Sequence, residues 1–128
     1  CGESGVQQWA LDKLQAVRDI VGRPLTITSA YRCSKHPVEA RKSKAGTHNQ
    51  GIAFDVYVSS GTERHELITT GLLVGANGIG VDKNFIHFDF FFYQGLLLAV
   101  VDSINDQIFM FTGATWTATI GVMHVITE

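Results

Sequence analysis

The chain has 128 residues, which is the size of one domain with a single hydrophobic core. It is 45% hydrophobic and 17% charged with a formal net charge of -2, an ordinary balance for a globular protein. This balance excludes binding to nucleic acid through overall charge, and we expect no nucleic-acid partner.

The longest apolar run covers residues 85–101, and His87, Asp89 and Gln94 interrupt it. A bilayer-spanning helix needs about 20 predominantly apolar residues, so this run is too polar and slightly too short. We therefore expect core strands in this region and no membrane span.

Two cysteines are present, Cys1 and Cys33. They could form a disulfide, supply half of a structural metal site, or be two unrelated thiols. We expect unrelated thiols, or the remainder of a larger cysteine cluster upstream. Because the sequence starts at Cys1 without a Met or a signal peptide, we expect a removed upstream segment or a fragment, and the localisation stays open.

The first elements in chain order are a helix and a strand. Apolar residues recur every three or four positions over residues 6–21, which predicts an amphipathic helix. Gly22 suits the C-terminal cap of this helix, and Pro24 prevents its continuation. The alternating, β-branched segment 25–30 predicts a strand.

A polar, basic segment follows at residues 31–49 and contains Pro37 and Gly46. It predicts a surface loop with one helical turn, and functional residues often lie on such loops. Residues 52–58 predict a second strand. Ser60 or Thr62 could then cap a second helix.

The remaining sequence predicts β-structure. Residues 77–81, "NGIGV", indicate a turn, and residues 84–93 indicate a strand or hairpin. Beyond Gln94 the sequence predicts further strands and contains no functional motif. A chain of this pattern is typical of an α+β domain, an antiparallel sheet with helices packed on one side.

One stretch, "AGTHNQGIAFDV" at residues 45–56, separates His48 from Asp55 by seven positions. A fully extended chain would place them about 23 Å apart, whereas two ligands of one zinc ion lie within about 4 Å. The chain must therefore turn between them. Gly51 stands where such a turn is needed, because glycine accepts a positive φ without steric cost.

A third ligand is available in "FIHFD", where His87 lies within an apolar strand. An unpaired imidazole buried there would be costly, and a metal ion would explain its placement. Two histidines and one carboxylate leave the fourth position for water, as in catalytic zinc sites. The alternative on pattern alone is a hydrogen-bonded core histidine and an aspartate that ends a strand.

The segments "ITSAYRCSKHP", "GTHNQGIAFDV" and "FIHFD" together resemble the zinc D-Ala-D-Ala carboxypeptidase family, with its hedgehog-like zinc fold. The family pattern Ser/Thr-x-His-x-x-Gly-x-Ala-x-Asp is complete in Thr47, His48, Gly51, Ala53 and Asp55. The resemblance covers residues 1–91. We expect residues 92–128 to form a β-rich tail of unknown role, packed on the same domain.

The resemblance implies one Zn²⁺ ion held by His48, Asp55 and His87. It also implies that Arg32 binds the substrate carboxylate or the developing oxyanion, a task that suits a permanently charged guanidinium. Ser29 and Tyr31 would then flank the cleft and position Arg32. His36 could contact substrate. His65 and His124 are expected to be structural or exposed.

The implied activity is zinc-dependent hydrolysis of peptidoglycan peptides, as a D,D-carboxypeptidase or an endopeptidase of the type found in phages and bacteria. The partner would be a peptidoglycan peptide at the bacterial cell wall, and the oligomeric state stays open. Alternatives are a zinc-containing binding module without turnover, as in hedgehog domains, and a phage structural protein.

The general base is where the sequence departs from part of the family. Asn84 occupies a position that is acidic in the dipeptidase-like branch, and an amide cannot accept the proton. Asp89 lies two residues after His87 on the same strand face, where it could orient a ligand or relay a proton. Asp82 is a weaker candidate.

Overall fold

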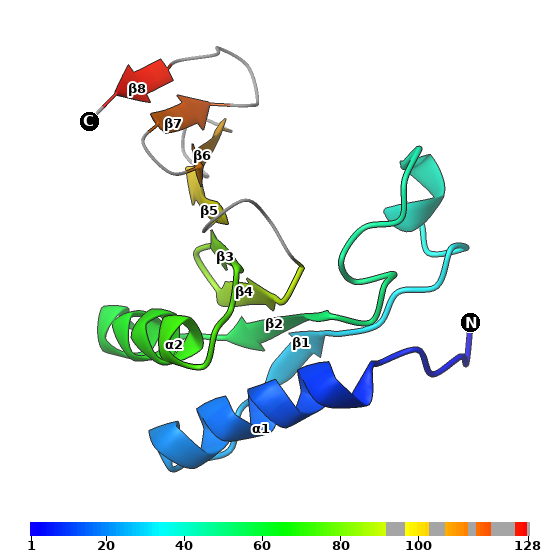
Figure 1. Ribbon diagram of the computed structural model, residues 1–128, viewed down its shortest axis with the longest axis horizontal. Helices are drawn as coiled ribbons and strands as arrows, with labels where there is room; N and C mark the ends of the chain where they lie inside the picture. The colour runs from blue at the N-terminus through cyan, green and yellow to red at the C-terminus, as the bar shows by residue number, and fades with distance from the viewer. Residues whose placement is uncertain (92–96, 103–106, 113–114, 119–124, 128) are drawn as a thin grey trace.

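The computed structural model of the protein describes residues 1–91, 97–102, 107–112, 115–118 and 125–127. Figure 1 shows the helices and strands in this part of the chain. The first half contains α1 (Gln8–Val21), β1 (Ile27–Ser29), the 3₁₀ turn η1 (Glu39–Arg41), β2 (Ala53–Tyr57), α2 (Gly61–Leu73), β3 (Gly78–Val81) and β4 (Phe85–Asp89). The later strands are β5 (Leu97–Asp102), β6 (Gln107–Thr112), β7 (Thr115–Ala118) and β8 (Val125–Thr127).

The strands form one sheet in the order β1-β2-β4-β3-β5-β6-β7-β8. Strands β1 to β4 pair antiparallel, which confirms the predicted α+β domain with an antiparallel sheet. Strand β5 joins β3 in parallel, and the strands after it pair antiparallel again. The β-like character of the sequence beyond Gln94 thus corresponds to strands that extend this sheet.

Helix α1 begins at Gln8, two residues later than the periodicity predicts, and ends at Val21. Gly22 adopts the left-handed conformation with φ 76° and donates its N–H to the Arg18 carbonyl, which confirms the predicted cap. The apolar stripe buries Ala10, Leu14 and Val17.

Helix α2 starts with the predicted cap, because the Ser60 side chain accepts a hydrogen bond from the Glu63 N–H. In return, Glu63 Oε2 accepts a hydrogen bond from the Ser59 N–H at 2.9 Å. Gly71 lies against the Phe88 ring, where a Cβ would overlap the ring. This close approach allows α2 to pack on β4, and α1 packs against α2.

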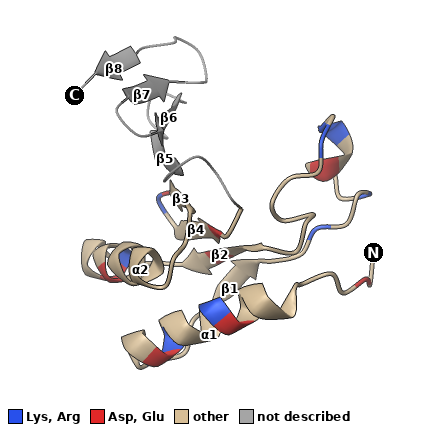
Figure 2. Cartoon of the chain, viewed as in Figure 1, with Lys and Arg blue, Asp and Glu red and all other residues tan. Residues whose placement is uncertain are grey.

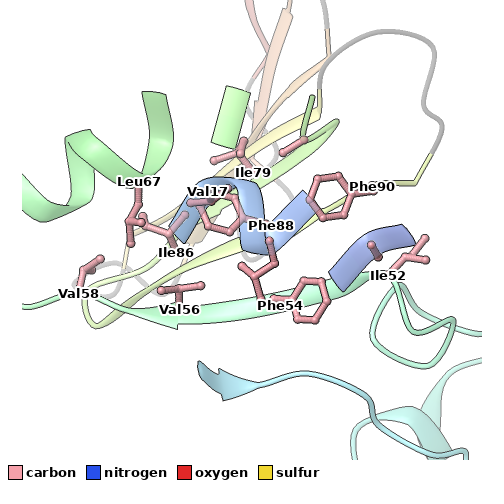
Figure 3. Packing of buried hydrophobic residues seen from close by; sticks show 13 residues of the cluster. Val17, Ile52, Phe54, Val56, Val58, Leu67, Ile79, Ile86, Phe88 and Phe90 are labelled. Carbon is pink, nitrogen blue, oxygen red and sulfur yellow. The ribbon is translucent and has the colours of Figure 1, made fainter. Parts of the chain in front are cut away.

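Alternation along β2 and β4 separates the core from the site. Phe54, Val56, Ile86 and Phe88 are buried on the face that packs with the helices (Figure 3). Asp55, His87 and Asp89 alternate with these core residues along the two strands and project to the opposite face. One short pair of strands therefore carries both the core and the polar cluster.

Residues 78–81 form strand β3, so the turn predicted at "NGIGV" is wrong. Gly78 pairs with Asp89 and Gly80 with His87 on the neighbouring strand. Gly78 and Gly80 have no side chains and so leave room for Asp89 and His87. Ile79, between the two glycines, is buried in the core. The turn itself lies just after this strand, where the Asp82 N–H bonds the Phe85 carbonyl.

Cys1 and Cys33 form a disulfide, so the expectation of unrelated thiols or an upstream cluster is wrong. Their Cα atoms lie 6.6 Å apart, within the range that a disulfide spans. The pairing is possible because residues before α1 fold back on the site, with the Gln7 N–H bonded to the Gly51 carbonyl at 2.9 Å.

In the described part of the chain no helix is long and apolar enough to cross a membrane. The loop at residues 31–49 contains one helical turn, η1, as predicted. His65 is exposed on α2, and His124 lies outside the described residues.

Candidate metal centre

The turn before β2 positions His48. Gly51 has φ 75°, and its N–H bonds the His48 carbonyl at 3.2 Å, so the chain reverses between His48 and the strand. Asp55 lies in the middle of β2, directly opposite His87 on β4. The predicted turn at Gly51 and the predicted convergence of the three residues are therefore present in the fold.

The three side chains meet at one oxygen. Asp55 Oδ1 lies 3.2 Å from His48 Nε2 and 2.8 Å from His87 Nδ1. One ligand atom from each residue lies within 4.8 Å of the others. Two imidazole nitrogens and one carboxylate oxygen form a donor set that suits zinc.

Each histidine is fixed through its other nitrogen. His48 Nδ1 lies 2.6 Å from the Ala30 carbonyl, which can only accept a hydrogen bond, so Nδ1 is the donor and Nε2 is directed toward Asp55. His87 Nε2 lies 2.9 Å from Asp89 Oδ2. Carbonyl and carboxylate partners of this kind orient the histidine ligands of metal sites.

The cluster strongly favours positive charge between its carboxylates. Burial alone would lower the pKa of His87, but hydrogen bonds with Asp55 and Asp89 outweigh burial and raise this pKa to about 9. Burial would likewise raise the pKa of Asp55, but hydrogen bonds with His48 and His87 hold it well below its ordinary value. A divalent cation at this place would be stabilised by the same negative charge.

Arg32 borders the cluster from the loop after β1. Its NH2 group lies 3.3 Å from Asp55 Oδ2, and its Nε–H donates to Ser29 Oγ at 3.0 Å. The Arg32 N–H also donates to the His48 carbonyl, and the Asn49 side chain donates to the Arg32 carbonyl. These contacts tie the arginine loop to the turn that carries His48.

Tyr31 and His36 lie with Arg32 on a pocket of about 430 Å³. None of the three cluster residues lines this pocket, so it adjoins the cluster only through Arg32. The structure thus brings the residues predicted at the site into two neighbouring groups, one around Asp55 and one around Arg32.

Asp89 is buried beneath His87, with 3% of its surface exposed. Besides the bond to His87, its Oδ1 accepts a hydrogen bond from the Phe91 N–H at 3.2 Å. A Cβ on Gly78 would overlap the Asp89 carboxylate. The side chains of Asp82 and Asn84 belong to the turn between β3 and β4, where Asp82 Oδ1 accepts from the Asn84 N–H.

Sequence reasoning missed three supports of the site, which are the Ala30 carbonyl, Gly78 and Glu39. Glu39 is buried and accepts hydrogen bonds from Lys42 Nζ at 2.9 Å and from the Gly46 N–H at 3.2 Å. It thereby closes the loop that leads into His48. The sequence contains Gly-x-Gly at Gly78 and Gly80 and His-x-Asp at His87 and Asp89. The strand register is needed to see that each glycine lies opposite one of these two larger residues.

A family model described as peptidase M15 matches residues 1–89. The chain belongs to the peptidase M15 family. The matched segment contains His48, Asp55 and His87, and the family consists of zinc peptidases. This confirms the resemblance to zinc D-Ala-D-Ala carboxypeptidases. Searches of curated proteins and of solved structures found no match.

Proposed function

We propose that the protein is a zinc peptidase that hydrolyses peptide bonds of peptidoglycan at the bacterial cell wall. The observation that carries this proposal is the convergence of His48, Asp55 and His87 within the segment matched to peptidase M15. The substrate class comes from the resemblance to D-Ala-D-Ala carboxypeptidases.

The ion would be held by His48 Nε2, the Asp55 carboxylate and His87 Nδ1. When bound, zinc supplies a Lewis acid for the scissile carbonyl and makes a water molecule acidic enough to act as nucleophile near neutral pH. The chain supplies ligands that are already oriented by Ala30 and Asp89, which lowers the cost of assembling the site.

Arg32 binds the substrate beside the ion. Its guanidinium already contacts Asp55, so it lies next to the position where the scissile carbonyl would be held. It can donate two parallel hydrogen bonds to a substrate carboxylate or stabilise the negative charge that develops on the carbonyl oxygen. Ser29 fixes the direction of the guanidinium through its Nε–H.

Asp89 acts on the reaction through His87. Its Oδ2 holds the His87 ring and its Oδ1 is bonded to the Phe91 N–H, so it serves as a positioning residue for the ligand. Replacement by Asn keeps the shape but removes the charge. We expect Asp89→Asn to weaken zinc binding by about 10- to 100-fold.

The disulfide supports action outside a reducing cytosol, because disulfides persist in oxidising compartments. A periplasmic or extracellular site of action agrees with a cell-wall substrate. A role as a phage lysin released to the wall fits the same observation.

The second candidate function is a zinc-containing binding module without turnover. Asn84 favours it, because its amide cannot accept a proton from the attacking water. The Arg32–Asp55 contact favours the enzyme, because it places an oxyanion-stabilising group beside the ligands.

The test is cleavage of purified peptidoglycan and of a peptide ending in D-Ala-D-Ala by the zinc-loaded chain. The wild type should release peptide products, and His48→Ala should lose both zinc and cleavage. His65→Ala is the matched control, because His65 is exposed on α2, and it should cleave normally. Bound zinc without cleavage of either substrate would establish the binding module instead.

A further inference from the structure

The segment before α1 crosses the loops that build the site and is anchored at three points. Cys1 is bonded to Cys33, and Gly5 lies against the Tyr31 ring so closely that a Cβ would overlap it. Gln7 donates its N–H to the carbonyl of Gly51. We call residues 1–7 the N-terminal strap. Figure 1 shows the strap running from α1 toward the loop after β1.

Each anchor of the strap is adjacent to a residue of the candidate metal centre. Tyr31 and Cys33 are the two chain neighbours of Arg32, and Gly51 ends the turn that carries His48. Cys33 is buried, with 5% of its surface exposed. The disulfide therefore attaches the strap to the residue that directly follows Arg32.

The strap forms one wall of the pocket of about 430 Å³. The strap contributes Cys1, Gly2 and Glu3 to the lining, and the loop after β1 contributes Tyr31, Arg32, Cys33, Lys35, His36 and Pro37. A pocket of this volume is large enough for part of a peptide. Since Arg32 lines the pocket and also contacts Asp55, the pocket adjoins the metal centre at Arg32.

Groups that donate hydrogen bonds predominate on the loop wall. Arg32 and Lys35 are cationic, and Figure 2 shows basic residues in this loop between β1 and β2. His36 Nδ1 accepts a hydrogen bond from the Val38 N–H, which leaves Nε2–H as the donor of this ring. Glu3 is the one acidic residue that lines the pocket. This lining suits a carboxylate.

We propose that the Cys1–Cys33 disulfide is a positioning element for substrate binding, because it holds the strap as the wall of a pocket that receives a carboxylate-bearing part of the peptide. The proposal rests on the proposed peptidase function. Lys35 supplies charge that attracts the carboxylate, and Glu3 on the strap limits which anionic groups enter. A purely structural disulfide would instead stabilise the fold and leave peptide affinity unchanged.

The first test uses the full, zinc-loaded chain with Cys1→Ser and Cys33→Ser combined. The KM for a D-Ala-D-Ala peptide with a free carboxylate should rise about fivefold or more, while the zinc content stays at the wild-type level and kcat changes little. The KM for the corresponding peptide amide should rise less. An unchanged KM at wild-type zinc content would overturn the proposal.

Two single variants keep the proposal falsifiable if the double variant fails to fold. Lys35→Gln should raise the KM for the free carboxylate by about two- to fivefold, the effect expected for one partly exposed ion pair, and Glu3→Gln should lower it. Lys44→Gln is the matched control, because Lys44 is exposed on the same loop and does not line this pocket. Equal effects of Lys35→Gln and Lys44→Gln would contradict the proposed pocket.

Calorimetric binding of the same two peptides separates this proposal from the proposed function. If the zinc-loaded wild type binds the peptides without cleaving them, the peptidase proposal fails. The difference in Kd between carboxylate and amide, and its loss in the disulfide variant, still decides the role of the pocket. If the wild type binds neither peptide, both proposals fail.

Discussion

At the scale of single residues, the site depends on what surrounds the ligands as much as on the ligands themselves. The proximity of His48 and Asp55 was predictable from the local sequence, because Gly51 lies between them and allows the chain to turn. The Ala30 carbonyl and the Cys1–Cys33 pairing could not be predicted, since both join positions whose distance only the fold determines.

Gly78 provides the sharpest test at this scale. Gly78→Ala would place a Cβ into the Asp89 carboxylate, which must move away from His87. We expect zinc affinity, measured by competition with a chelator, to fall by about tenfold or more. Gly61→Ala is the control, because a Cβ there meets nothing within 4 Å. Wild-type zinc affinity in Gly78→Ala would show that Asp89 does not orient His87.

At the scale of elements, apolar periodicity predicted α1, a capping residue predicted the start of α2, and runs of apolar residues predicted β2 and β4. These patterns failed at β3, because glycine has low strand propensity and Gly78–Val81 resembles a turn. What makes this segment a strand is its place beside His87 and Asp89, where larger side chains would not fit. The strand propensity of residues 78–81 cannot reveal that β4 lies beside them.

The loop before His48 is an element whose stability should depend on pH. Burial would raise the pKa of Glu39, but hydrogen bonds from Lys42 and the Gly46 N–H outweigh it and lower the pKa below its ordinary 4.5. A lowered folded-state pKa stabilises the fold above the unfolded pKa, and this contribution is lost as the pH falls through the folded value.

Glu39→Gln should therefore lower the free energy of unfolding by about 1 kcal/mol at pH 7. The difference from the wild type should shrink as the pH falls below 4.5, where the wild-type carboxylate becomes protonated. Urea titrations of both chains at a series of pH values measure it. A difference that stays constant down to pH 2 to 3, or grows, would rule out this role of Glu39.

At the scale of the whole molecule, residues 1–91 contain the matched family segment and the ligands, and the sheet continues beyond them through β5 to β8. The α+β class was predictable from the order of helical and strand patterns. The parallel pairing of β3 with β5 was not, because the connection between them, residues 82–96, includes β4 and gives no local indication of direction.

The disulfide should stabilise the whole fold in addition to its proposed role at the pocket. It joins residues 32 positions apart, and closing a loop of this length stabilises a protein by about 3–4 kcal/mol through the unfolded state. Urea unfolding of the combined Cys1→Ser and Cys33→Ser variant should show a loss of this size. A loss near zero would contradict this contribution of the disulfide to stability.

His48, Asp55 and His87 should together hold one zinc ion. The most direct measurement is the zinc content of the reconstituted chain, combined with X-ray absorption spectroscopy of the bound ion. We expect about one zinc per chain, coordinated by two imidazoles and a carboxylate at about 2.0 to 2.2 Å. His48→Ala should lose the ion. Failure to bind zinc after reconstitution, or a sulfur ligand in the spectrum, would rule out this site.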